Sequence, residues 1–112
     1  MIEGKPVPQA RPRVVRGRAY YPKGSQDHRN RLIQAFLLEH GSETPVEGPV
    51  RLQVRICRPH RGSDLSNHLK MVEDALVDAG VLPEDNVQVV QEVSLEAVWE
   101  DSPWTEVTIS PL

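Results

Sequence analysis

The stretch Val50-Arg51-Leu52-Gln53-Val54-Arg55-Ile56 alternates aliphatic and polar side chains without interruption. A period of two places every second side chain on the same face of a β-strand. One face of this strand is aliphatic, as a strand that packs against helices requires, and the other face carries arginine and glutamine. The pattern therefore predicts a half-buried strand near the middle of the chain.

A helix is predicted on each side of this strand. The first covers residues 26–40, with Ser25 as its N-cap and Gly41 after its end. Its apolar residues recur at helical spacing, at Leu32, Ile33, Phe36 and Leu37. The second runs from its N-cap Ser66 to Gly80. Its apolar stripe consists of Leu69, Val72, Leu76 and Ala79.

Further strands are predicted towards both termini. Alternating apolar residues indicate strands over 87–99 and 105–109. Residues 4–13 contain three prolines and are expected to be extended. A small basic hairpin follows around Gly17. The order of elements predicts an α+β fold in a single domain, 1–112: a mixed sheet of about four strands, two helices packed on one face, and an N-terminal basic hairpin.

Length and composition exclude several classes of protein. A chain of 112 residues is the size of one domain. It has no apolar run of the ~20 residues that cross a bilayer and no apolar segment typical of a secretory signal, so a cytoplasmic protein is expected. The single cysteine, Cys57, excludes an intrachain disulfide and a cysteine-based zinc site. The four histidines do not have zinc-ligand spacing and are interpreted as surface or packing residues.

The formal charge of −3 conceals a strong asymmetry along the chain. Residues 1–70 hold all 13 lysines and arginines and six acids, a net charge of +7, whereas residues 71–112 hold ten acids and no lysine or arginine. A basic region of this kind favours a polyanion such as DNA. The alternative is that the two regions neutralise each other within the fold or across a dimer.

Two polar clusters are candidates for chemistry. Residues 63–70 lie where a loop enters the second helix, and residues 84–89 precede a strand. If the chain brings them together, carboxylates beside Lys70 suit Mg²⁺ and phosphodiester hydrolysis, because hard cations take oxygen ligands. Lys70 would neutralise charge that develops on phosphorus. The structural alternative is that Ser66 caps a helix, Lys70 pairs with Asp74, and Asp85-Asn86 is a turn.

Three stretches resemble the RusA family of Holliday-junction resolvases. Residues 4–13, Gly-Lys-Pro-Val-Pro-Gln-Ala-Arg-Pro-Arg, are similar to the opening Gly-x-Pro-Val-Pro-x-x-Arg-Pro-Arg of the family. Residues 64–70, Asp-Leu-Ser-Asn-His-Leu-Lys, followed by Asp-Ala-Leu, are similar to Asp-x-Asp-Asn-x-x-Lys and Asp-Ala-Leu. Residues 85–89, Asp-Asn-Val-Gln-Val, are similar to Asp-Asp-x-Gln-Val.

The resemblance implies a homodimer that binds four-way DNA junctions and cuts them with Mg²⁺ in DNA recombination and repair. It matches Asp64 and Asp85 to metal-binding acids of the family and Lys70 to the lysine needed for cleavage. Ser66 and Asn86 complete the expected catalytic set, and Asn86 is expected to help to hold the metal through its amide. Ser66 and Asn86 stand where the family has acids, so the implied site has lost two negative charges. The residues expected to contact DNA are Arg11, Arg13, Arg16, Arg18, Lys23 and Asn67.

Three hypotheses follow from these observations. The first is a Mg²⁺-dependent, structure-selective endodeoxyribonuclease. The second is a catalytically impaired homologue that binds junction DNA, because Ser66 and Asn86 are neutral. The third is a small protein-interaction module whose acidic region pairs with a basic partner.

Overall fold

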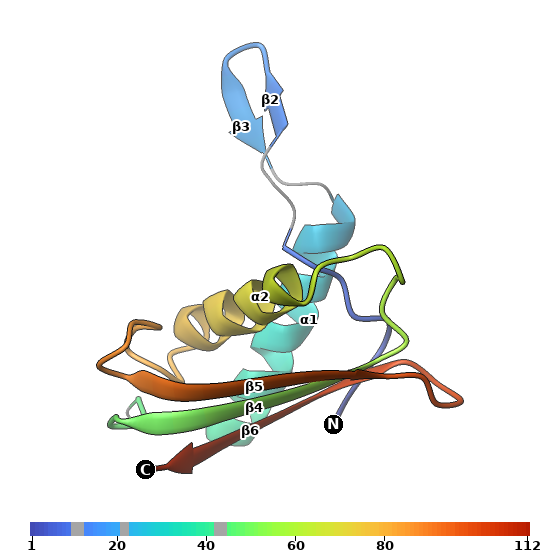
Figure 1. Cartoon of the computed structure of the whole chain (residues 1–112). Coiled ribbons are helices and arrows are strands. Elements are labelled where there is room, and N and C mark those ends of the chain that lie inside the picture. Colours follow the sequence, from blue (N-terminus) through green and yellow to red (C-terminus); the bar gives the residue numbers. More distant parts are fainter. Residues whose placement is uncertain (10–12, 21–22, 42–44) are drawn as a thin grey trace.

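The computed structural model describes residues 1–9, 13–20, 23–41 and 45–112, and for residues 13–15 and 18–20 it describes the backbone alone. Two helices lie on the same side of a four-stranded sheet, and a separate two-stranded hairpin is formed by β2 and β3 (Figure 1). The elements are β1 (Ile2–Glu3), β2 (Arg13–Val15), β3 (Arg18–Tyr20), α1 (Lys23–His40), β4 (Val50–Cys57), α2 (Leu65–Asp78), β5 (Val90–Val98) and β6 (Trp104–Pro111).

The alternating stretch forms β4, which lies between two other strands of the sheet. It pairs in parallel with β5 and antiparallel with β6, and the strand order is β1-β6-β4-β5. The sheet is therefore mixed, and the predicted α+β fold is confirmed. The predicted hairpin is also present, and its turn places Arg16 and Gly17 at positive φ.

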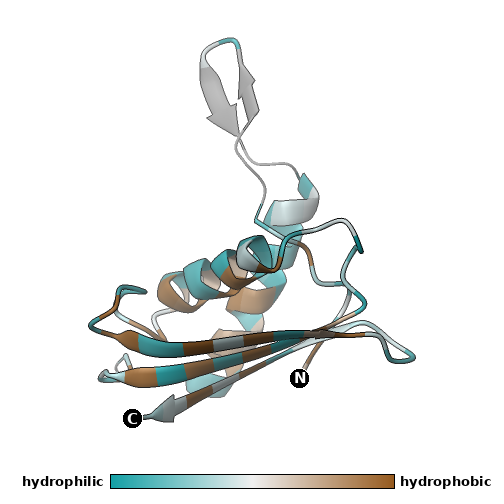
Figure 2. Ribbon diagram, viewed as in Figure 1, coloured by the Kyte–Doolittle hydropathy of each residue, from teal (hydrophilic) through white to brown (hydrophobic). Residues whose placement is uncertain are grey.

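The core lies between the sheet and the two helices. The aliphatic side chains of β4 are at most 1% exposed, and Figure 2 shows apolar and polar residues alternating along the strands. Two groups of helix residues meet them: Leu32 and Phe36 of α1, and Met71, Val72, Ala75 and Leu76 of α2. Full burial of one such side chain contributes about 1.5–3 kcal/mol, so this layer fixes α2 against the sheet.

The helix starts differ from the sequence prediction. Ser25 does not cap α1, which begins at Lys23; Ser25 lies inside the helix and is buried. Ser66 does not cap α2, because the extended residue before the helix is Asp64, at φ −86° and ψ 136°. Both serines are therefore helical residues in first turns, and Asp64 occupies the N-cap position without a capping bond from its side chain.

The strand predicted from residue 87 begins later, at Val90. Asn86 causes the delay, because its carbonyl accepts hydrogen bonds from the amides of Val89 (3.0 Å) and Val90 (2.9 Å) and closes a turn. Val87 is consequently 80% exposed. The two-residue strand β1 has no periodic signal, and it is held by pairing with Thr105 and Trp104 of β6.

The β4–α2–β5 connection determines where loops meet. Because β4 and β5 are parallel, the loop after β4 and the turn after β5 lie at one end of the sheet, and the segment before β5 lies at the other. The loop after β4 turns back from the first end into α2, which leads the chain towards the second end (Figure 1). No helix among the described residues is long and apolar enough to cross a membrane.

Candidate functional site

The start of α2 presents polar side chains to solvent. The carbonyl of Asp64 accepts hydrogen bonds from the amides of Asn67 (3.2 Å) and His68 (3.3 Å), which anchor the first turn. Asp64, Ser66, Asn67 and Lys70 are exposed. Residues three and four apart are neighbours on a helix, so Ser66 and Asn67 share an edge with Lys70.

The same edge continues towards Glu73 and Asp74, which lie three and four residues beyond Lys70. Glu73 is half-buried. Burial is the main cause that raises the pKa of Glu73 above its ordinary value; the charges of Asp85 and Asp74 raise it further, and that of Lys70 lowers it. Lys70 and Asp85 are thus both within electrostatic reach of Glu73, a residue that belongs to neither predicted cluster. Its spacing of three from Lys70 is the signal that would have identified it.

The second polar cluster forms the exposed turn before β5. The Asn86 Oδ1 accepts a hydrogen bond from the amide of Gln88 at 3.0 Å, and its Nδ2 donates to Glu84 Oε2 at 2.5 Å. Both polar groups of this amide therefore stabilise the turn. Asp85 lies between Glu84 and Asn86 and is exposed, so its side chain faces solvent.

The two clusters lie at different places along α2. Asp64 is the residue before the helix, whereas Asp85 lies in the turn before β5 and is near enough to Glu73, further along the helix, to raise its pKa. Glu73 is about 12 Å along the axis from the first residue of α2, at 1.5 Å per residue. Among the described residues, no three side chains of His, Cys, Asp or Glu are placed to hold one metal ion.

Each helix carries a buried histidine with a polar partner close by in the sequence. His28 and His68 are 3% and 2% exposed, so these two are packing residues. Ser63 Oγ donates to the carbonyl of His60 at 2.5 Å, and His68 Nε2 lies 2.7 Å from Ser63 Oγ. Because that hydroxyl proton is already used, His68 Nε2 is the donor in this contact.

His28 makes the matching contact in α1. Its Nδ1 accepts a hydrogen bond from Arg31 Nη2 at 2.8 Å, since the guanidinium can only donate. Burial, and then the positive charges of Arg31 and His68, lower the pKa of His28 to about 4. The N-terminal segment is joined to the same region by a hydrogen bond of 2.9 Å from the amide of Gln9 to the carbonyl of Asn67. These contacts hold the polar start of α2 in place.

The charge asymmetry is partly neutralised inside the fold. Three arginines of the basic region pair with acids of the acidic region: Arg29 with Asp78, Arg51 with Glu92 at 2.6 Å, and Arg55 with Glu96 at 3.8 Å. Of the residues expected to contact DNA, Arg16 and Lys23 are exposed. Arg11 lies outside the described residues, and Arg13 and Arg18 are among those described by their backbone alone.

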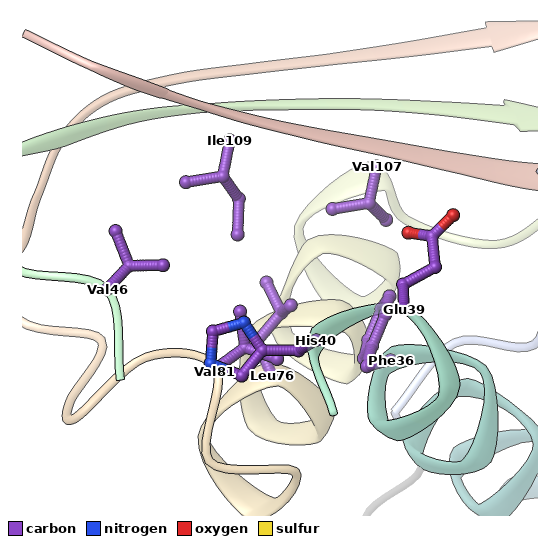
Figure 3. A pocket seen from close by; sticks show the side chains of 8 residues that line it. All are labelled: Phe36, Glu39, His40, Val46, Leu76, Val81, Val107 and Ile109. Atoms are coloured by element: carbon purple, nitrogen blue, oxygen red, sulfur yellow. The ribbon is translucent and has the colours of Figure 1, made fainter. Parts of the chain in front are cut away.

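An apolar cavity of about 250 Å³ lies elsewhere, between the end of α1, the end of α2 and β6 (Figure 3). Aliphatic side chains and Phe36 form most of its lining, with Glu39 and His40 at its edge. This cavity is an extension of the core, whereas the candidate site is the polar edge of α2.

The fold and this edge define a class: a small α+β domain that presents carboxylates and a lysine on one helix, beside a basic N-terminal region. That combination is suited to acting on a polyanion. The family model described as "Endodeoxyribonuclease RusA" matches residues 3–110, nearly the whole chain. The chain therefore belongs to the RusA family of endodeoxyribonucleases, which are Holliday-junction resolvases. No curated protein matches it significantly.

Proposed function

We propose that this protein is a Mg²⁺-dependent, structure-selective endodeoxyribonuclease that cuts four-way DNA junctions as a homodimer in recombination and repair, in the cytoplasm. The observation that carries the proposal is the polar edge of α2, where the charges of Lys70 and Asp85 both shift the pKa of Glu73. A nuclease needs negatively charged oxygens for a metal ion next to a cation that faces the phosphate, and this edge supplies both kinds of group.

The proposed metal ligands are Asp64, Asp85 and Asn86. Asp64 lies at the start of α2 and Asp85 near Glu73 further along the helix, so we expect the ligands of a single chain to form an incomplete Mg²⁺ site. Mg²⁺ is commonly held by one or two carboxylates together with water and substrate phosphate, so few protein ligands are sufficient. When bound, the ion would supply Lewis-acid chemistry at the phosphate. Lys70 would provide positive charge beside it.

A second copy of the chain would remove the separation of the two acids. In a two-fold dimer, the start of α2 in one copy can face the turn before β5 in the other, and the symmetry repeats the contact. Each dimer would then hold two sites, each with Asp64 from one copy and Asp85 from the other. Two sites related by a two-fold axis match the two cuts that resolve a four-way junction.

The proposal is tested by incubating the protein with a synthetic four-way junction and Mg²⁺ or Mn²⁺. We expect paired nicks, and a loss of at least about tenfold in rate for Asp64→Asn and for Asp85→Asn, since tenfold corresponds to only about 1.36 kcal/mol of transition-state stabilisation. Glu47→Gln, which neutralises an exposed acid before β4, is the control and should cut normally.

A junction-binding homologue without cleavage is the second candidate. The side chain of Asn86 favours it, because both of its polar groups are engaged in the turn and it carries no charge for a cation. Junction binding by the wild-type protein without nicking in either metal would support this candidate and reject the nuclease.

A further inference from the structure

A pocket of about 390 Å³ lies at the end of the sheet where β4 and β5 finish. Three segments meet there: the residues after β1, the loop after β4, and the turn between β5 and β6 (Figure 1). Its functional side chains are Lys5, Arg58, His60, Arg61 and Trp99, and we call it the Trp99 pocket. None of these residues belongs to the polar edge of α2.

The charge of the Trp99 pocket is positive and uncompensated. Among the residues that the structure describes, no acidic side chain lines it. Over the same ranges, Lys5, Arg58 and Arg61 make no ion pair, whereas Arg51 and Arg55 on the sheet are paired with glutamates. Three cations that converge without counter-charges create a potential that attracts an anion such as a phosphate.

The pocket also offers an aromatic surface. Trp99 is 46% exposed, and the guanidinium carbon of Arg61 lies 5.0 Å from the centroid of its ring. Arg55 lies in a similar way over Trp104, at 5.4 Å, but Trp104 is only 7% exposed and has no room for a ligand. An exposed indole beside cations is the combination that binds single-stranded nucleic acid, because bases stack on the ring while the cations hold the backbone.

Hydrogen bonds fix the walls of the pocket. Arg58 has a φ of 59°, its amide donates to the carbonyl of Val98 at 2.8 Å, and its Nη1 donates to the carbonyl of Glu100 at 2.9 Å. The amide of Glu100 in turn donates to Cys57 Sγ at 3.2 Å. The loop after β4 and the turn after β5 are therefore tied together, and the pocket is formed before any ligand arrives.

His60 adds a donor of defined position. Its Nδ1 accepts a hydrogen bond from the amide of Gly62 at 3.1 Å, so the neutral ring carries its proton on Nε2. The Lys5 segment is held by a bond of 3.2 Å from the amide of Gly4 to the carbonyl of Pro103. Donors of the pocket thus come from three segments that are tied to one another.

We propose that the Trp99 pocket binds one nucleotide of single-stranded DNA, with its base stacked on Trp99 and its phosphate held by Lys5, Arg58 and Arg61. The assignment of DNA rests on the proposed function. The loop that lines the pocket continues through Ser63 directly into Asp64, so a strand bound here is led towards the start of α2. The nucleotide would be one left unpaired at the branch point of the junction.

The test is the affinity for a fluorescently labelled dT decamer, measured in EDTA so that no cleavage occurs. We expect Trp99→Ala to bind about tenfold more weakly, in line with the stacking energy of one base, and Arg61→Ala to be weakened similarly. Trp99→Phe keeps a ring and should stay close to wild type. Arg55→Ala removes the same charge from the sheet and should also stay close to wild type.

Tryptophan emission gives a second readout. The decamer should quench wild-type emission, and the quenching should vanish in Trp99→Phe, because the remaining Trp104 is buried. The proposal is refuted if Trp99→Ala and Arg61→Ala both bind the decamer as tightly as the wild type. It is also refuted if Arg55→Ala weakens binding as much as Arg61→Ala does. Failure of the proposed function gives a different result. If the wild-type protein does not cut junctions but Trp99→Ala still binds the decamer more weakly, nucleotide binding by the Trp99 pocket is supported and the nuclease is not.

Discussion

Asn86 uses both polar groups of its side chain within the turn before β5. An aspartate at this position would keep the oxygen that accepts from Gln88, but it would replace the donor to Glu84 with a second negative charge. Glu84, Asp85 and residue 86 would then form a run of three acids that repel one another. A divalent cation relieves such repulsion, so in the proposed metal site the neutral amide would stabilise the turn at the expense of metal affinity.

The double substitution Ser66→Asp with Asn86→Asp tests this balance. We expect junction cleavage to rise by about tenfold or more, because about 1.4 kcal/mol of additional metal binding already gives a factor of ten. The measurement is the nicking rate at a limiting Mg²⁺ concentration. Ser66→Asn with Asn86 unchanged is the matched control, since it adds nearly the same volume without charge. A double variant no faster than this control would show that charge at the two positions is unimportant.

The stability of the packing between α1 and α2 is expected to depend on pH. In the folded protein, His28 accepts from Arg31 and is buried next to His68, so its pKa of about 4 means that it takes up a proton only near that pH. In the unfolded chain, it takes up a proton near pH 6.5. Between these values the unfolded state binds more protons, so the free energy of unfolding falls as the pH is lowered through this window and His28 causes no further loss below it.

We expect this effect to cost about 2–3 kcal/mol between about pH 6.5 and about pH 4. The measurement is urea unfolding of the wild type and of His28→Gln across this range. The glutamine of this variant can still accept from Arg31 but does not titrate, so the stability of the variant should fall less with pH. The difference between the two proteins isolates His28 from His68, whose pKa is also lowered by burial. Parallel pH profiles would exclude the assigned role.

The elements in which apolar residues recur with a regular period were predictable from the sequence. β4, α2 and β6 appear close to their expected places, because each buries one face and the alternation or helical spacing reports that face directly. The starts of α1 and α2 were not predictable, since a serine near a helix start is equally compatible with an N-cap and with a buried position such as that of Ser25. The turn at Asp85-Asn86 was anticipated, but its continuation to Val89 was not, because the valines at 87 and 89 are typical of a strand.

The polar edge of α2 could be predicted only in part. Asp64, Lys70 and Asp85 come from short motifs, and a motif carries no information about distance between segments. Whether Asp64 and Asp85 meet depends on the direction of β5, which is set by pairing with β4 rather than by local sequence. Glu73 belongs to no motif, and its spacing of three from Lys70 is the only signal in the sequence; its burial and the nearby charge of Asp85 arise from packing. Similarly, the Trp99 pocket joins segments that are far apart in the sequence.

The whole molecule combines internal neutralisation with uncompensated charge at defined places. Three ion pairs use arginines of the basic region to neutralise acids on the sheet and helices. The cations of the Trp99 pocket and the exposed Lys70 are left for a ligand. A net charge of −3 is therefore compatible with DNA binding, because phosphates meet the local surface and not the average charge.

The separation of Asp64 from Asp85 leads to the prediction that distinguishes a shared site from a site within one chain. If each site takes Asp64 from one copy and Asp85 from the other, a mixed dimer of Asp64→Asn with Asp85→Asn has one site with both substitutions and one intact site. If each site lies within one chain, both sites of the mixed dimer are damaged.

The two variants are co-expressed with different tags and purified through both, so that only mixed dimers remain. We expect each homodimer to be inactive and the mixed dimer to nick one strand of the junction, at about half the wild-type rate of strand cutting. The product should be a nicked junction rather than two resolved duplexes, because one dimer has only one intact site. A mixed dimer as inactive as its parents, beside an active wild-type dimer carrying the same tags, would place Asp64 and Asp85 in one chain's site and would refute the shared arrangement.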